Sequence, residues 1–160
     1  MTITNNNIEV TILYWIALIT LAIDQLAKYI TRSFMEYGQT IPIIDNFFHI
    51  TSHRNAGAAW GIFSGQKFFL ISIAFIVIIG IIFYARKVTD KLTRIALGLF
   101  IGGAAGNVTD RLIFGEVTDM FDIQFINYPI FNTADVFLVS GAILLLISTY
   151  RETKTQKNLT

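Results

Sequence analysis

Four long apolar stretches alternate with more polar segments along the chain. An α-helix rises about 1.5 Å per residue, so about 20 mostly apolar residues are needed to cross the roughly 30 Å hydrocarbon layer of a bilayer. Each stretch is close to that length. The pattern therefore predicts four transmembrane helices, at residues 11–30, 68–85, 92–114 and 129–150.

The segments outside these stretches differ in their content of basic residues. The connection 86–94 carries four Lys or Arg residues and the tail 151–160 carries three, whereas 115–128 carries none. Short basic segments remain in the cytoplasm, so we expect both termini and the 86–94 connection to face inward and segments 31–67 and 115–128 to face outward. The first stretch is expected to be retained as a helix, because no basic residue precedes it and no cleavage motif ends it.

The outer segment 31–67 has a pattern of its own. Residues 41–52 are rich in β-branched and aromatic residues and precede a turn signal at 55–57, which together predict a small β-element. Residues 58–69 mix aromatic and small side chains, as is typical of the membrane interface. We therefore expect an all-α membrane protein with a single domain over residues 1–160, an outward-facing β-element and an interfacial segment.

The composition agrees with a membrane location and argues against several kinds of chemistry. The chain is 54% hydrophobic and 14% charged, against roughly 25% charged residues in soluble domains, and its mean hydropathy is +0.59. A net charge of +1 gives no electrostatic basis for nucleic-acid binding. The chain has no cysteine and only two histidines, so we expect no thiolate chemistry, no metal and no cofactor.

Polar side chains within the predicted helices lie at a similar depth. Counted from the inner helix ends, Asp24 and Asn107 each lie about 20 Å up, and Asp135 in the descending fourth helix lies about 22 Å up. Charged groups inside a membrane cost at least about 2.5–3.5 kcal/mol at its centre and are usually functional. Their shared level in the outer third of the bilayer predicts a pocket that opens outward.

Some of these polar residues also have a purely structural interpretation. Asp24 and Lys28 lie four residues apart on one helix face and can pair. A pair between Asp110 and Arg111 would likewise hold helices in register. Asn132 can either cap the fourth helix or face a substrate, and the sequence leaves these alternatives open.

Asp119 and Asp135 differ from these pairs, because no Lys or Arg lies between Arg111 and Arg151. Two carboxylates in a partly desolvated pocket cannot both ionise easily, so one of them should hold a proton near neutral pH. The ionised carboxylate can then take a proton from water while the neutral one protonates a leaving group. This is the arrangement of an aspartic protease, and which aspartate holds the proton remains open.

Other functions are compatible with intramembrane carboxylates. A small ion-coupled transporter could use them as a proton relay, but its polar groups should reach the midplane or both faces. Here the second helix has no charge and the inner halves of the others are apolar. A membrane scaffold would leave the two aspartates without a role. A serine–lysine mechanism would require Lys28 and a serine such as Ser64, Ser72 or Ser140.

Five short motifs occur in one order between residues 24 and 135. They are Asp24-Gln-x-x-Lys28, Asn55-x-Gly57-Ala-Ala-Trp60-Gly61, Gly103-Ala-x-Gly-Asn107-x-x-Asp110-Arg111, Val117-x-Asp119 and Phe131-Asn132-x-Ala134-Asp135. In these motifs and in its apolar stretches the chain resembles the prolipoprotein signal peptidase family, also called signal peptidase II. Thr118 and Met120 depart from that pattern, because the resemblance implies more hydrophobic or aromatic residues beside Asp119.

The resemblance implies a role for each motif residue and a fold of four transmembrane helices with an outward β-cradle. Asp119 and Asp135 are implied to be the catalytic pair. The residues implied to bind substrate or to support the site are Asn55, Gly57, Asn107, Arg111, Asn132, Asp24, Lys28 and Asp110.

The resemblance also implies a substrate and a location. The implied substrate is a bacterial prolipoprotein whose cysteine carries a diacylglyceryl group, cleaved before that cysteine to release the signal peptide. Membrane lipid and inhibitors of the globomycin type are the other implied partners. We expect a monomer in the bacterial cytoplasmic membrane with its active site on the extracytoplasmic side.

Overall fold

The structure is a computed structural model that describes residues 2–126 and 128–157. Within these residues the chain forms the helices α1 (Thr2–Phe34), α2 (Lys67–Ala85), α3 (Lys91–Phe114) and α4 (Thr133–Lys157). Each helix contains a segment long and apolar enough to cross a membrane, which confirms the four predicted spans. These segments are Thr11–Phe34, Lys67–Ala85, Lys91–Phe114 and Thr133–Thr155.

The first and fourth helices differ from their predicted bounds at both ends. The first runs from Thr2 to Phe34 instead of 11–30, and the fourth runs from Thr133 to Lys157 instead of 129–150. The later start has a clear cause, because Phe131 forms an antiparallel bridge with Phe121. The Phe131 carbonyl accepts the N–H groups of Met120 at 2.9 Å and of Phe121 at 2.8 Å, so the oxygen that a helix begun at residue 129 would use is already bonded to β3.

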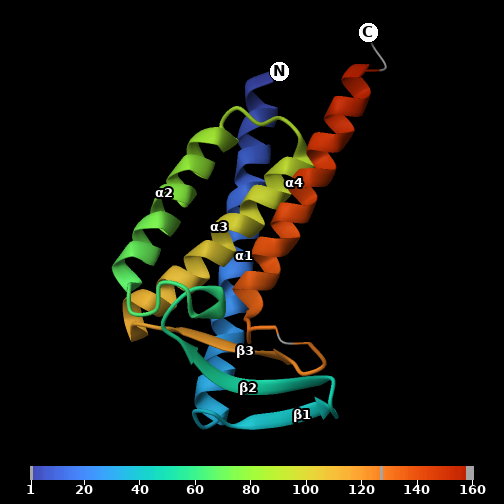
Figure 1. Cartoon of the computed structure of the whole chain (residues 1–160). Coiled ribbons are helices and arrows are strands. Elements are labelled where there is room, and N and C mark those ends of the chain that lie inside the picture. Colours follow the sequence, from blue (N-terminus) through green and yellow to red (C-terminus); the bar gives the residue numbers. More distant parts are fainter. Residues whose placement is uncertain (1, 127, 158–160) are drawn as a thin grey trace.

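Helices α1 and α4 pack closely against α3, whereas α2 lies to one side of the bundle (Figure 1). Small residues on α3 make the close contact with α1 possible. A Cβ atom at Gly98 would lie 2.8 Å from the Leu13 carbonyl oxygen, and one at Gly102 would lie 2.6 Å from that of Ala17. Larger residues at these positions would push α1 away from α3.

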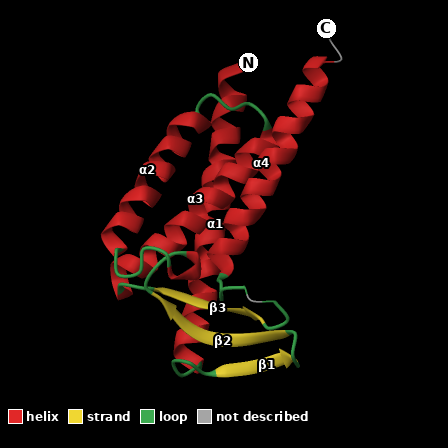
Figure 2. Cartoon of the chain, viewed as in Figure 1, coloured by secondary structure: helices red, strands yellow, loops and turns green. Residues whose placement is uncertain are grey.

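A three-stranded antiparallel sheet lies across one end of the bundle (Figure 2). Its strands, in spatial order, are β1 (Thr40–Ile44), β2 (Phe48–Asn55) and β3 (Val117–Ile123). The first two strands confirm the β-element predicted at residues 41–52. The third strand comes from the connection 115–128 and was not predicted.

The segment between β2 and α2 contains a single 3-10 turn, η1 (Ala59–Gly61), and exposes several aromatic side chains. Trp60 is 69% exposed and Phe63 is 45% exposed. Both Trp60 and Phe63 have positive φ angles, 55° and 57°, which residues other than glycine rarely adopt. The predicted interfacial segment therefore has the aromatic surface expected of it, while its depth in a membrane stays a prediction.

Candidate active site

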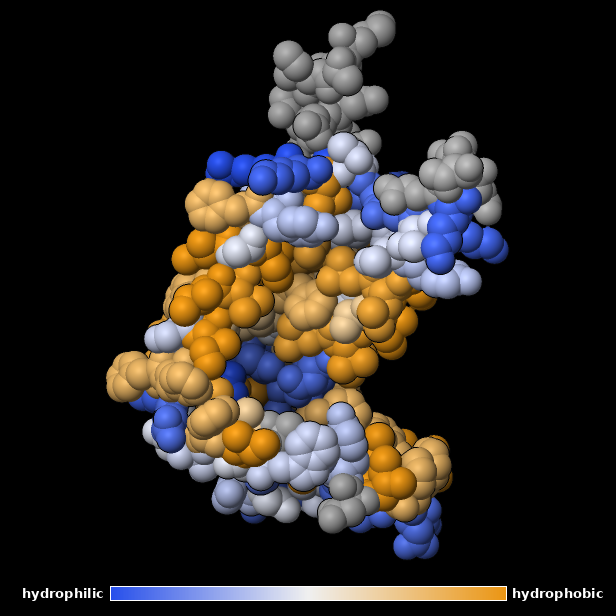
Figure 3. All heavy atoms as spheres, turned by 45° about the horizontal axis from the view of Figure 1, so that its top comes forward, coloured by the Kyte–Doolittle hydropathy of each residue, from blue (hydrophilic) through white to orange (hydrophobic). Residues whose placement is uncertain are grey.

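The two aspartates implied to be catalytic come from different elements and line the same cavity. Asp119 lies within β3 and is 1% exposed, and Asp135 is the third residue of α4. The cavity they share has a volume of about 350 Å³. Figure 3 shows hydrophilic residues gathered in a hollow between the apolar helices and the sheet layer.

Asn132 fixes the position of Asp135 through the start of α4. Its Oδ1 atom accepts a hydrogen bond from the Asp135 N–H at 3.1 Å, and its own N–H donates to Asp135 Oδ2 at 3.1 Å. This reciprocal arrangement caps a helix and holds both side chains in place. The capping role considered for Asn132 is therefore confirmed.

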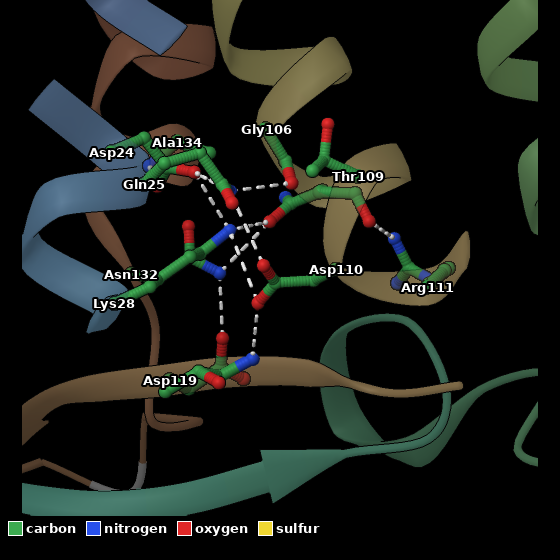
Figure 4. Close-up of polar contacts among 12 residues, drawn as sticks. Asp24, Gln25, Lys28, Gly106, Thr109, Asp110, Arg111, Asp119, Asn132 and Ala134 are labelled. Atoms are coloured by element: carbon green, nitrogen blue, oxygen red, sulfur yellow. Dashed lines mark hydrogen bonds and ion pairs between the residues drawn. The ribbon is translucent and has the colours of Figure 1, made fainter. Parts of the chain in front are cut away.

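The Asn132 side chain also reaches the other aspartate. Its Nδ2 atom donates to Asp119 Oδ1 at 2.6 Å and to Asn107 Oδ1 at 3.1 Å. Figure 4 shows Asn132 directed toward Asp119 on β3. Asn132 thus joins the start of α4 to both β3 and α3, so the two interpretations of this residue are not exclusive.

Asn107 connects Asp135 to a buried lysine. Its Oδ1 atom accepts a hydrogen bond from Lys28 Nζ at 2.8 Å, and its Nδ2 atom donates to Asp135 Oδ1 at 3.0 Å. Because a cationic donor holds the oxygen side of the amide, the nitrogen side must face Asp135. These contacts confirm that residues of α1, α3 and α4 meet at one level.

Asn55 holds the second oxygen of Asp119 from the end of β2. Its Nδ2 atom donates to Asp119 Oδ2 at 2.9 Å, and its Oδ1 atom accepts from the Gly57 N–H at 2.9 Å. Gly57 is confined on its other side, because a Cβ atom there would lie 2.8 Å from the Ile62 carbonyl oxygen. A glycine is therefore needed for the turn that aims Asn55 at the cavity.

A fully buried ionic cluster supports these residues from behind. Lys28 Nζ lies 2.9 Å from Asp24 Oδ2 and 3.7 Å from Asp110 Oδ2, and none of these three side chains is exposed. Asp24 Oδ1 also accepts the backbone N–H of Ala134 at 2.8 Å, one residue before Asp135. Removing one partner would leave a buried charge uncompensated, which is strongly unfavourable.

Arg111 does not pair with Asp110, and this part of the structural interpretation was wrong. Its Nη2 atom donates to the Gly57 carbonyl at 2.7 Å, and its Nη1 atom donates to the Asn107 carbonyl at 3.4 Å. Asp110 instead pairs with Lys28 and Arg32, both of α1. Side chains of neighbouring helix residues point about 100° apart, so Asp110 and Arg111 contact different partners.

The charge state of Asp119 is altered by its surroundings. Its pKa is raised to about 6 from an ordinary value of 3.8, chiefly because burial disfavours the charged form. The hydrogen bonds from Asn132 and Asn55 oppose this rise, and the negative charge of Asp135 adds to it. Asp119 is therefore able to hold a proton near neutral pH.

Sequence reasoning missed several residues of this network, and one signal could have found some of them. Gln25 Nε2 donates to the Gly106 carbonyl and to Asp110 Oδ1, both at 3.2 Å. Arg32 follows Asp24 and Lys28 at the same four-residue spacing, which places all three on one helix face. That spacing indicates one polar stripe on α1 rather than an isolated pair.

Other parts of the described chain offer no comparable site. A cavity of about 360 Å³ lies at the opposite end of α3, beside Asp90, Ser148 and Arg151. Its carboxylate already caps α3, because Asp90 Oδ2 accepts the Thr93 N–H at 2.7 Å. Among the residues that the structure describes, no group of three or more His, Asp or Glu side chains could hold a metal ion.

Solved structures with the same architecture define the class of protein. Two structures of a bacterial membrane enzyme, determined by the in meso method at 2.3 and 1.9 Å resolution, superpose on this fold. The first has a TM-score of 0.84 and 37% identity, covering 91% of each chain. The second has a TM-score of 0.79 and 38% identity, covering 87% of this chain and 92% of the other. The fold is thus one that it shares with structures of bacterial membrane enzymes.

The sequence comparisons then identify the family. The family model for signal peptidase (SPase) II matches residues 16–151. A lipoprotein signal peptidase from Bacillus subtilis (strain 168) is 51% identical over 138 residues, which cover 84% of this chain and 90% of that protein. The chain belongs to the signal peptidase II family, as its motifs indicated.

Proposed function

We propose that this protein removes the signal peptide from bacterial prolipoproteins whose cysteine carries a diacylglyceryl group, cleaving before that cysteine as an aspartic endopeptidase. The observation that carries the proposal is the convergence of Asp119 and Asp135 on one cavity, each held by amide donors. Membership of the signal peptidase II family supports the substrate class.

The surroundings of the two carboxylates favour different roles. Asp135 lies in the first turn of α4, where the helix dipole and the N–H of Asn132 stabilise negative charge. Asp119 is buried within a strand and has a pKa of about 6. We therefore assign the proton to Asp119 and the role of general base to Asp135.

The proposed reaction needs only water and these two groups. Asp135 takes a proton from water as the water oxygen attacks the scissile carbonyl carbon, and Asp119 gives its proton to the carbonyl oxygen. When the tetrahedral intermediate collapses, Asp135 gives its proton to the departing amine of the lipidated cysteine. Asp119 then recovers a proton from a hydroxyl of the new carboxyl group. No covalent bond to the protein forms.

The walls of the cavity suit a peptide that is attached to lipid. On one side lie the polar groups, and on another lie Leu138 and Val139 of α4. Val139 is 55% exposed on a helix able to span a membrane, so this side is open to acyl chains. Arg111, held against Gly57, places a cation at the polar wall, where it can contact the peptide backbone.

The proposal is tested with Asp119→Asn and Asp135→Asn, assayed by the gel shift of a lipidated precursor. Both variants should insert into the membrane and leave the precursor uncleaved, because each lacks one proton-transfer group. Full processing by either one would refute the paired mechanism.

Serine variants provide the matched control. Ser64→Ala, Ser72→Ala and Ser140→Ala should each process the precursor at the wild-type rate. Lys28, the base that a serine mechanism would require, is already engaged by Asp24 and Asn107. Loss of processing in one of these variants would favour the serine–lysine alternative. A proton relay is not favoured, since these polar groups gather at one end of the bundle.

A further inference from the structure

Arg32, at the outer end of α1, makes three contacts that the proposed reaction does not use. Its Nη1 atom donates to Asp110 Oδ2 at 3.2 Å and to Thr118 Oγ1 at 2.8 Å. Its guanidinium carbon lies 4.1 Å from the centre of the Phe114 ring. Arg32 thus joins the end of α1 to the end of α3 and to β3, with a side chain only 17% exposed.

Thr118 is the residue immediately before Asp119, and it is 1% exposed. A buried hydroxyl needs a hydrogen-bond partner, and Arg32 supplies one. The Thr118 backbone is held as well, because its N–H donates to Asp110 Oδ2 at 2.9 Å. Thr118 stands where the family resemblance implied a hydrophobic residue beside Asp119. Its two hydrogen bonds anchor β3 to α1 and α3 at this point.

The sheet alone gives β3 an imperfect support at this point. Strand β2 pairs with β3 in a register that shifts between Ile50 and His53, and His53 lies opposite Asp119. An irregularity of this kind bends a strand and disrupts its ladder of hydrogen bonds. The backbone at Asp119 thus depends on contacts from outside the sheet to keep its position.

We propose that Arg32 and Thr118 form a positioning pair that fixes the backbone of Asp119 relative to Asp135. Asn132 and Asn55 orient the Asp119 carboxylate, whereas Arg32 and Thr118 set the position of β3 relative to the ends of α1 and α3. Displacement of a catalytic group by about 1 Å can lower a rate by about a hundredfold. This inference rests on the proposed catalytic role of Asp119.

The test compares steady-state kinetics on a lipidated precursor for the whole protein in detergent micelles. Thr118→Val keeps the shape of the side chain and removes its hydroxyl, and Arg32→Met removes the guanidinium but keeps an apolar stem. Each should lower kcat by about tenfold and leave KM within about twofold, because the cavity walls stay in place while the acid is displaced. Arg32→Lys should recover most of kcat, since one ammonium nitrogen can donate to both Asp110 and Thr118.

Coupling between the two residues separates positioning from general destabilisation. The double variant Arg32→Met/Thr118→Val should be no slower than Arg32→Met, because both changes break the same contact. Lys67→Met is the matched control: its ammonium group also lies beside a phenylalanine ring, at 5.2 Å from the Phe68 centroid. This control should retain the wild-type kcat.

Several results would overturn the inference. They are a wild-type kcat in Thr118→Val, a loss expressed in KM alone, and strictly multiplicative effects in the double variant. If Arg32→Met fails to fold, Thr118→Val decides the question. Asp119→Asn is assayed in parallel: an active Asp119→Asn variant refutes the proposed function, whereas an inactive one beside a fully active Thr118→Val variant refutes only the positioning pair.

Discussion

The raised pKa of Asp119 predicts that this carboxyl group destabilises the folded protein above pH 6. Its pKa is about 6 in the folded protein, against an ordinary value of 3.8. Between these two values the folded state keeps a proton that the unfolded state has lost, so the free energy of unfolding falls as the pH rises. The cost is absent below pH 3.8 and complete above pH 6.

The size of this effect follows from the difference between the two pKa values. Each pKa unit corresponds to about 1.36 kcal/mol, so a difference of about 2.2 units gives a cost of about 3 kcal/mol at neutral pH. Asp119 is 1% exposed, so solvent does little to screen this cost. For a chain of this size, 1 kcal/mol changes the melting temperature by about 2–4 °C.

Asp119→Asn removes the titrating group, and thermal unfolding of both proteins in detergent measures the consequence. Relative to the wild type, the variant should gain about 3 kcal/mol of stability between about pH 4 and about pH 7. A constant offset from altered hydrogen bonds with Asn132 and Asn55 does not depend on pH. Asp119→Ser serves as a second neutral variant and should show the same gain with a different offset. A difference between wild type and variants that stays constant over this range would refute the argument that burial raises this pKa.

Three further predictions concern the residues that support the site. Gly106→Ala should lower the melting temperature by an amount that corresponds to about 1–3 kcal/mol, because its Cβ atom would collide with the Asp24 carboxylate. Gly80→Ala is the control and should not be destabilised, because nothing lies within 4 Å of a Cβ atom at that position. Lys28→Met should cost about 3–5 kcal/mol in the same assay, since it leaves buried carboxylates unpaired, and unchanged stability would contradict the ionic cluster. Asn132→Ser should lose about 1–3 kcal/mol of stability and most precursor cleavage, because serine can cap α4 but is too short to donate to Asp119 and Asn107. Full cleavage would show that the amide is dispensable.

The helices were predictable because their determinants are local. A membrane span must be apolar over a fixed length, and the rise per residue of a helix then sets the depth of each polar group. This is why counting residues brought Asp24, Asn107 and Asp135 to one level, as their hydrogen-bonded connections confirm. The start of α4 was placed too early, since apolar character alone does not reveal that Phe131 bridges to Phe121.

Strand β3 was not predictable from its own residues. Val117–Ile123 contains two aspartates, and aspartate is depleted in strands. Its pairing partner is β2, which lies more than 60 residues earlier in the chain. The position of Asp119 within a sheet is therefore a tertiary outcome, and so is the contact of Thr118 with Arg32.

The two aspartates of the site are held in different ways, and the difference explains why one was easier to place than the other. Asp135 is fixed by its own helix start, since Asn132 lies three residues before it and caps the same helix. Asp119 has no local support of this kind and is held by Asn55, Asn132 and the anchored Thr118. Asn132 takes part in both arrangements. Because it caps α4 and also donates to Asp119, it fixes the distance between the two carboxylates. A change that breaks the bonds of Asn132 should therefore alter the separation of Asp135 and Asp119, even when neither aspartate is altered.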